Sequence, residues 1–292
     1  MPSRPVTLAI VAFWLLTAGW FVARDVLPHW RTGDPPPFTI EFADEALKNV
    51  FQRWTALRNG EKIGTIKTGQ AYQESDDTFE LSAAATQDGL RLAAFGPVTI
   101  TAREFHDRVR INRDGELRAV ATDATLALNG AGPEMVGRFR LSAAVRGGRL
   151  ERHALFEVPG LVKSEPVLEP TDPPRGRVLN PMHPVPRITG LRPGQEWRQP
   201  LIDPRSDLLR AALTQLAGGR LPGLPDPPTE LAARVLPEPE VVSWNSEQHV
   251  CYVIEYRGGE DYVAHTWVRV SDGAVMRQEA DAHGETLVLQ RE

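Results

Sequence analysis

Cysteine is nearly absent from this chain: Cys251 is the single one in 292 residues. One cysteine cannot form an intramolecular disulfide, so the sequence excludes a disulfide-stapled scaffold. A chain of this length can bury a core large enough to be stable without such bonds. A free cysteine commonly behaves as a small buried apolar residue, and we interpret Cys251 in that way.

Basic charge is also scarce, because 33 Lys and Arg stand against 38 Asp and Glu, giving a net charge of −5. Lysine occurs only as Lys48, Lys62, Lys67 and Lys163, and the two signs are interspersed along the chain. Proteins that neutralise nucleic-acid phosphates need a basic surface or stripe. We therefore predict no nucleic-acid partner.

Motifs that carry chemistry are missing as well. There is no Gly-x-Ser-x-Gly elbow, and the glycine pairs 147–148 and 258–259 lie between predicted strands, whereas a phosphate-binding loop opens a helix. His249, Cys251 and His265 fall on neighbouring predicted strands, but no fourth ligand or Cys-x-x-Cys spacing accompanies them. We predict no catalytic residue, no metal site and no cofactor.

One long apolar run is present, at residues 6–23, which contain no charged residue. As a helix this run is about 27 Å long, close to the roughly 30 Å of a bilayer hydrocarbon core. Arg4 and the terminal amine precede it, whereas Arg24 and Asp25 nearly cancel after it. The positive-inside rule then places the N-terminus in the cytoplasm and the remainder outside.

A cleaved signal peptide is the rival interpretation of this run. Small residues at 17–19 suit a cleavage site, but the apolar run continues beyond them. Cleavage after Ala23 would put the bulky Phe21 where a small side chain is required. We favour an uncleaved single-pass anchor in residues 1–30, with a periplasmic C-terminal domain; both interpretations export that domain.

The rest of the chain is rich in proline and glycine (25 and 24 residues), as is typical of turn-rich β proteins. Residues 31–43 form a linker. Residues 44–158 and 188–292 form two β halves, and the proline-rich stretch 159–187 joins them. Short alternating segments separated by turns such as Asn59-Gly60 predict antiparallel neighbours.

Two helices are predicted beside these strands. Residues 44–51 suit a brief one. The stronger prediction is 204–217, where Asp203 is a good N-cap and Pro204 occupies the favoured first position. We therefore expect a mainly β (α+β) fold in which one or two helices pack on the sheet.

The order of these features suggests a family. A glycine hairpin at 59–64 is followed by strands, an Asp-Pro-initiated helix at 202–209, and a meander that ends at 267–273. This order resembles exported β proteins of unknown function related to the LolA/LolB lipoprotein carriers, over roughly 51–292. The resemblance implies a curved antiparallel sheet or half-barrel with a concave apolar face. The long proline connection departs from a compact carrier, and no functional residue can be carried across.

Three functions follow as hypotheses. The leading one is a non-catalytic, membrane-anchored extracytoplasmic protein that binds an apolar ligand, such as lipid, or an envelope protein partner. An apolar groove would be lined by Trp54, Trp197, Trp244 and Trp267, which are otherwise core or rim aromatics. The alternative is a structural or assembly factor of a membrane complex, and the third is an unrecognised hydrolase. A carrier requires an apolar concavity, an assembly factor an exposed apolar patch, and an enzyme converging titratable groups.

Overall fold

The structure is a computed structural model that describes the larger part of the chain. The predicted anchor at 6–23 and the predicted helices at 44–51 and 204–217 lie almost wholly outside the described part. Four residues of the anchor are described, and they are helical and exposed. Of the predicted helix at 44–51 only Phe51 is described, and it is not helical. In the described part, no helix is long and apolar enough to cross a bilayer. The described residues are 51–95, 98–129, 134–160, 162–165, 168–174, 182, 185–201, 230–259, 262–282 and 285–292, with Phe13, Trp14, Thr17 and Trp20.

Long strands with alternating polarity make up the first half of the fold. In β6, for example, Phe139, Leu141 and Ala143 are buried, whereas the alternate residues Arg138 and Arg140 are exposed. The strands are β1 (Gln52–Arg58), β2 (Glu61–Gln73), β3 (Thr78–Phe95), β4 (Val98–Ile111), β5 (Leu117–Asn129), β6 (Met135–Arg146), β7 (Arg149–Val158) and β8 (Val162–Ser164).

Shorter strands make up the second half. They are β9 (Glu196–Pro200), β10 (Glu230–Val235), β11 (Glu240–Trp244), β12 (Glu247–Gly258), β13 (Tyr262–Arg269), β14 (Val275–Ala282) and β15 (Glu285–Arg291). All pairings are antiparallel, which confirms the mainly β prediction.

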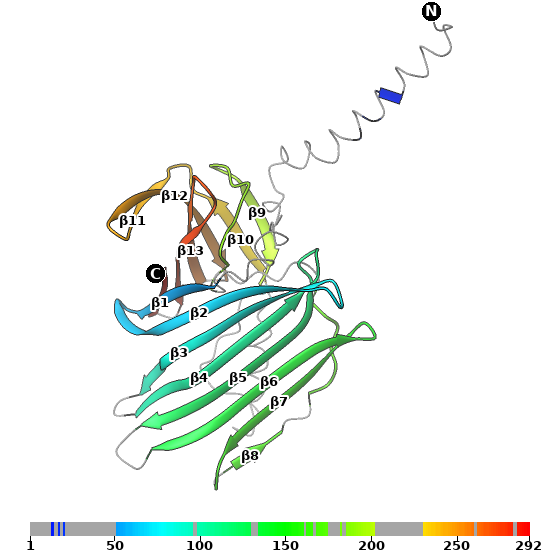
Figure 1. Ribbon diagram of the computed structural model, residues 1–292, viewed down its shortest axis with the longest axis vertical. Helices are drawn as coiled ribbons and strands as arrows, with labels where there is room; N and C mark the ends of the chain where they lie inside the picture. The colour runs from blue at the N-terminus through cyan, green and yellow to red at the C-terminus, as the bar shows by residue number, and fades with distance from the viewer. Residues whose placement is uncertain are drawn as a thin grey trace, which may run out of the picture.

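The strands form one sheet in the order β8-β7-β6-β5-β4-β3-β2-β1-β15-β14-β13-β12-β10-β9, with β11 paired to β12 beside β10 (Figure 1). The two halves meet where β1 pairs with β15, with Trp54 opposite Arg291 and Ala56 opposite Leu289. The proline-rich connection therefore joins two parts of the same sheet.

One face of this sheet carries the core, and we call it the inner face. A first cluster combines Trp54, Leu90 and Ala102 from the first half with Trp197 and Ile254 from the second. A second cluster lies along β3–β7. Phe105 and Leu126 pack against both clusters, so the apolar interior is continuous between them.

A glycine-dependent irregularity interrupts the pairing of β2 and β3. The register passes from Gly64 opposite Leu90 to Ile66 opposite Ala85, so extra residues of β3 bulge out. Gly89 has φ +73°, and a Cβ on Gly64 would lie 2.6 Å from the Gly89 carbonyl oxygen. Only glycine allows the two backbones this approach.

The opposite face of the sheet, the outer face, differs between the halves. Over β12–β14 it is covered by a third cluster around Cys251, Val253 and Met276, onto which Leu236 and Trp244 pack. Over β3–β7 the outer face carries small and charged side chains instead. That region holds the pockets described next.

Candidate functional site

Strand register aligns the side chains of the outer face in rows that cross β3–β7. Antiparallel partners lie about 5 Å apart, so residues in a row are neighbours on the surface. One row contains Ser82, Arg108, Ala121, Ser142 and His153. The next row contains Glu80, Arg110, Ala119, Ala144 and Glu151.

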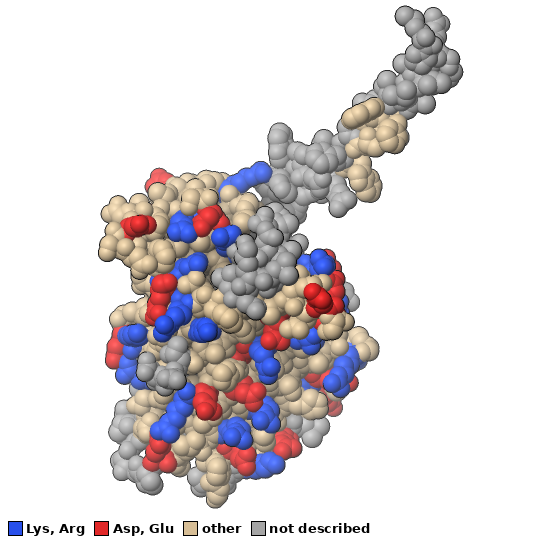
Figure 2. Space-filling view, viewed as in Figure 1, with Lys and Arg blue, Asp and Glu red and all other residues tan. Residues whose placement is uncertain are grey.

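These rows enclose a pocket of about 340 Å³, which we call the arginine groove. Its floor is low because Ala119, Ala121, Ser142 and Ala144 have short side chains. In Figure 2, positive and negative side chains are interspersed over the surface that these strands form. The polar residues that rise beside this floor are Glu80, Arg108 and Arg110 on one side and Arg146, Glu151 and His153 on the other.

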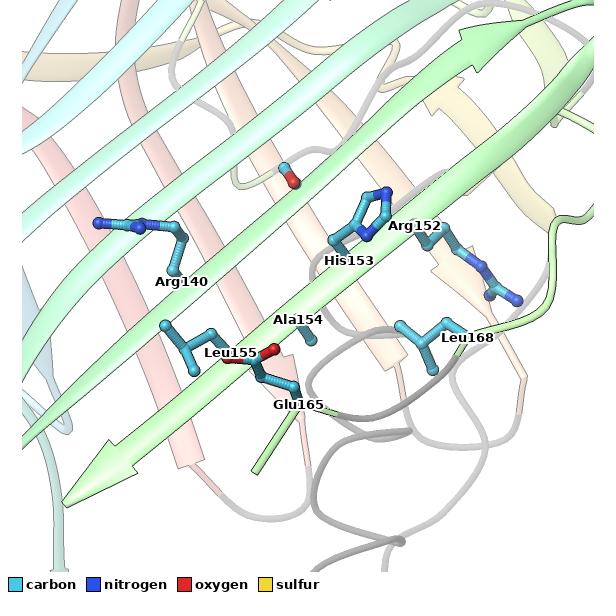
Figure 3. Close-up of a pocket in the computed structure, with 8 residues that line it drawn as sticks. Arg140, Arg152, His153, Ala154, Leu155, Glu165 and Leu168 are labelled. Atoms are coloured by element: carbon cyan, nitrogen blue, oxygen red, sulfur yellow. The ribbon is translucent and has the colours of Figure 1, made fainter. Parts of the chain in front are cut away.

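A second pocket, of about 440 Å³, lies at the β7 edge of the sheet (Figure 3). Arg140, Arg152, Glu165 and Leu168 line it. Its outer boundary is the segment after β8, since the Arg152 guanidinium donates to the Glu169 carbonyl at 2.8 Å. Ser142 and His153 line both pockets, so the edge pocket extends the arginine groove across β6 and β7.

Most arginines around these pockets are already paired. Arg110 forms an ion pair with Asp76, and Arg146 lies 3.4 Å from Glu151. Arg140 donates to Asp123 at 2.8 Å, and this hydrogen bond raises the pKa of the guanidinium.

Arg108, His153 and Glu80 differ from these arginines. Within the described ranges, none of the three has a hydrogen bond or ion pair. Arg108 and His153 are also exposed. An incoming group can therefore bind to them without breaking an existing pair.

The four predicted groove tryptophans fall into two pairs. Trp54 and Trp197 lie in the inner-face core, where their indole N–H groups donate to Thr68 Oγ1 at 3.0 Å and Gln199 Oε1 at 2.8 Å. Trp244 and Trp267 belong to the third cluster, on the outer face. The sheet separates the two pairs, so the described residues contain no groove lined by all four.

His249, Cys251 and His265 do not converge either. Cys251 is opposite Arg269 and is fully buried, whereas His265 is opposite Glu255 further along β12. Burial raises the pKa of the Cys251 thiol to about 11. No group of three or more His, Cys, Asp or Glu that could hold a metal ion occurs among the described residues.

The arginine groove itself was not predicted from the sequence. The alternation of β5 places Ala119 and Ala121 on one face, and that signal is visible in the sequence. The alignment of Arg108 with His153 depends on the register of three strand pairs. The turn lengths and bulges that set this register cannot be read from composition or periodicity.

Comparisons with protein families, with curated proteins and with solved structures found no match to this chain. The assignment of a function therefore depends on the geometry alone.

Proposed function

We propose that this chain is a non-catalytic, membrane-anchored binding protein whose arginine groove receives an anionic group of a ligand or an envelope partner. The observation that carries the proposal is Arg108, which has no hydrogen bond or ion pair among the described residues and faces His153 across a floor of small residues. The described pockets are open, and each is lined by several arginine and glutamate side chains beside apolar ones. They suit the polar part of a ligand or partner better than a bare acyl chain.

The proposed location is the extracytoplasmic side of the cell membrane, with residues 6–23 as a single-pass anchor. The absence of charge over these residues and the basic N-terminal flank support it. Ser271 lies in an exposed turn and the native Cys251 is buried, so a Ser271→Cys variant carries one accessible thiol. In cells with a permeabilised outer membrane, an impermeant maleimide should label it; labelling only after lysis would contradict export.

A LolA/LolB-like half-barrel remains our proposal for the finer fold. A single antiparallel sheet with its two larger apolar clusters on one face supports it. In such a half-barrel the arginine groove lies on the convex side. A carrier-type interior and the groove would then be separate features of one molecule.

Site-specific photo-crosslinking in cells tests the binding function. A photoreactive amino acid at Ser82 lies beside Arg108 in the same row of the outer face, and one at Ser271 is the matched control. We expect an adduct from position 82 that is absent from position 271 and is lost in an Arg108→Glu background. The adduct mass separates a lipid from a protein. An adduct unaffected by Arg108→Glu, or no adduct, would contradict the proposal.

An assembly factor of a membrane complex is the second candidate, favoured by one apolar patch. Val241, Val250 and Val270 are 60%, 52% and 43% exposed. Val241 is opposite Val250, and the Val270 N–H donates to the Val250 carbonyl at 3.0 Å, so the three are adjacent.

This candidate predicts that the valine patch contacts another subunit. A Val241→Thr, Val250→Thr variant keeps β-branched residues on both strands and removes apolar contact. If the patch assembles a complex, the variant should elute at lower mass than wild type after mild detergent extraction. Unchanged elution would leave the binding function as the better account.

A further inference from the structure

We propose that the arginine groove recognises a phosphate ester that carries a neighbouring amine, a group of the phosphoethanolamine class. This inference rests on the proposed function and specifies the group that the groove binds. Three observations support it: the donors of the groove, the carboxylate of Glu80, which has no partner in the described part of the chain, and the size of the groove.

The donors come from three different strands. Arg108 lies on β4, Ser142 on β6 and His153 on β7, all in one row, with only Ala121 between Arg108 and Ser142. A planar carboxylate is matched well by one guanidinium in a bidentate pair. Donors that approach from two sides and from the floor instead suit the several non-bridging oxygens of a tetrahedral phosphate.

The surrounding charges place the phosphate in this row. Arg110 is paired with Asp76, and Arg146 with Glu151. An anion that binds either guanidinium must therefore compete with the carboxylate already paired with it. Arg108 has no partner in the described part of the chain. A phosphate over Ala121 and Ser142 therefore gains a charge-assisted hydrogen bond and disrupts no ion pair.

The carboxylate of Glu80 accounts for the preference for an amine beside the phosphate. Glu80 is diagonal to Arg108 across β3 and β4, and diagonal neighbours in a sheet lie about 7–8 Å apart. It also lacks a partner among the described residues. A bare anion in the groove is repelled by Glu80, whereas an ammonium linked to that anion by a short chain can pair with it.

The groove has the size of a headgroup. Its volume of about 340 Å³ lies near the lower end of ligand pockets, which span roughly 300–1,000 Å³. The polar head would bind here and any chains would remain outside.

Calorimetric titration of the full chain, in a maltoside detergent that contains no phosphate, tests the inference. The probes are O-phosphoethanolamine, ethyl phosphate and ethanolamine. We expect O-phosphoethanolamine to bind most tightly. Arg108→Gln should weaken it about tenfold or more, as for loss of a hydrogen bond to a charged group. Glu80→Gln should abolish only the preference over ethyl phosphate.

Arg138→Gln is the matched control, because Arg138 is exposed on the outer face of β6 and does not line the groove. It should bind like wild type. Equal thermal stability of the variants confirms that each one folds. No heat from O-phosphoethanolamine at millimolar concentration, or equal effects of Arg108→Gln and Arg138→Gln, would overturn the inference.

Titration with short-chain lipids separates the two sources of this chemistry. If the source is a lipid, the full chain in maltoside should bind short-chain phosphatidylethanolamine more tightly than short-chain phosphatidylcholine, and Arg108→Gln should abolish the difference. Binding of O-phosphoethanolamine without this lipid preference identifies a free phosphate ester. A position-82 crosslink without probe binding would overturn this inference and leave the proposed function standing.

Discussion

Trp54 shows how one polar atom is accommodated in the interior. The side chain is fully buried, and its N–H donates to Thr68 Oγ1 at 3.0 Å. Trp54→Phe removes this bond and opens a small void, so we expect a loss of about 2–4 kcal/mol in the free energy of unfolding.

Trp244→Phe is the matched control, measured in the same denaturant titrations. Trp244 is half-buried and its N–H has no partner in the described structure. The expected loss is below about 1 kcal/mol. Equal losses in the two variants would contradict a contribution from the Trp54 hydrogen bond.

Burial determines the reactivity of the Cys251 thiol. It is fully buried, and desolvation raises the pKa of its thiol to about 11. Since the thiolate is the reactive form, we expect almost no reaction with a disulfide reagent at pH 8 in the native protein. The thiol should react fully after unfolding in guanidinium chloride. Rapid native reaction would mean that the third cluster opens readily.

Asp272 makes a contribution to stability that depends on pH. Hydrogen bonds from the Arg269 guanidinium, at 2.6 and 2.8 Å, lower the pKa of its carboxyl from 3.8 to about 2. A depressed pKa stabilises the fold above about pH 4, and this contribution is lost as the pH falls toward 2.

An Asp272→Asn variant tests this coupling. The carboxyl is partly exposed, so screening by solvent reduces the effect, and we expect a loss of about 1 kcal/mol at neutral pH. The difference from wild type should vanish at pH 2 in thermal melts recorded across this range. A difference that persists at pH 2 would assign the effect to packing.

At the scale of the elements, the bulge between β2 and β3 shifts the register of this strand pair by 3 residues, because 5 positions of β3 (Ala85 to Leu90) match 2 positions of β2 (Gly64 to Ile66). Gly64→Ala would place a Cβ 2.6 Å from the Gly89 carbonyl oxygen, and backbone atoms must shift to relieve the overlap. We expect a destabilisation of about 1–3 kcal/mol in urea titrations.

Gly147→Ala provides the comparison for this substitution. Gly147 has a positive φ but no atom within 4 Å of an added Cβ. It should therefore cost only about 1 kcal/mol of backbone strain. If the Gly64→Ala variant were as stable as the Gly147→Ala variant, the bulge would accommodate the added Cβ without an additional loss of stability.

Local elements could be predicted from the sequence where a short residue pattern alone determines their structure. The Asn59-Gly60 turn has positive φ at both residues, as a two-residue hairpin requires. The alternation of β5 also appears as predicted. The arginine groove was not predictable, because it depends on bulges in β3, β4 and β5 that shift registers by one or two residues. The side-chain sets on the two faces follow from those shifts.

At the scale of the whole molecule, the first core cluster crosses the junction of the two halves. It packs Trp54 and Leu90 against Leu231 and Val268. We therefore expect one cooperative unfolding transition, in which backbone amides of β5 and β13 exchange with the same free energy as denaturant is added.

A Thr55→Pro variant tests the cause of this cooperativity. Proline in β1 interrupts a strand paired on both sides, opposite Gln290 and Thr65. We expect β5 and β13 to separate into two transitions in this variant. Two transitions already present in the unmodified protein would show that the halves are independent.

The seam between β1 and β15 also sets the order in which the protein can be made. It joins residues up to 240 positions apart, and the Glu292 N–H donates to the Arg53 carbonyl at 3.0 Å. During synthesis, β1–β8 can pair in succession. The free edge of β1 stays unpaired until its partner β15 is synthesised much later. An open edge in the middle of the future sheet invites pairing with the wrong chain. Nascent chains that stop before β15 are therefore the species most in need of a chaperone.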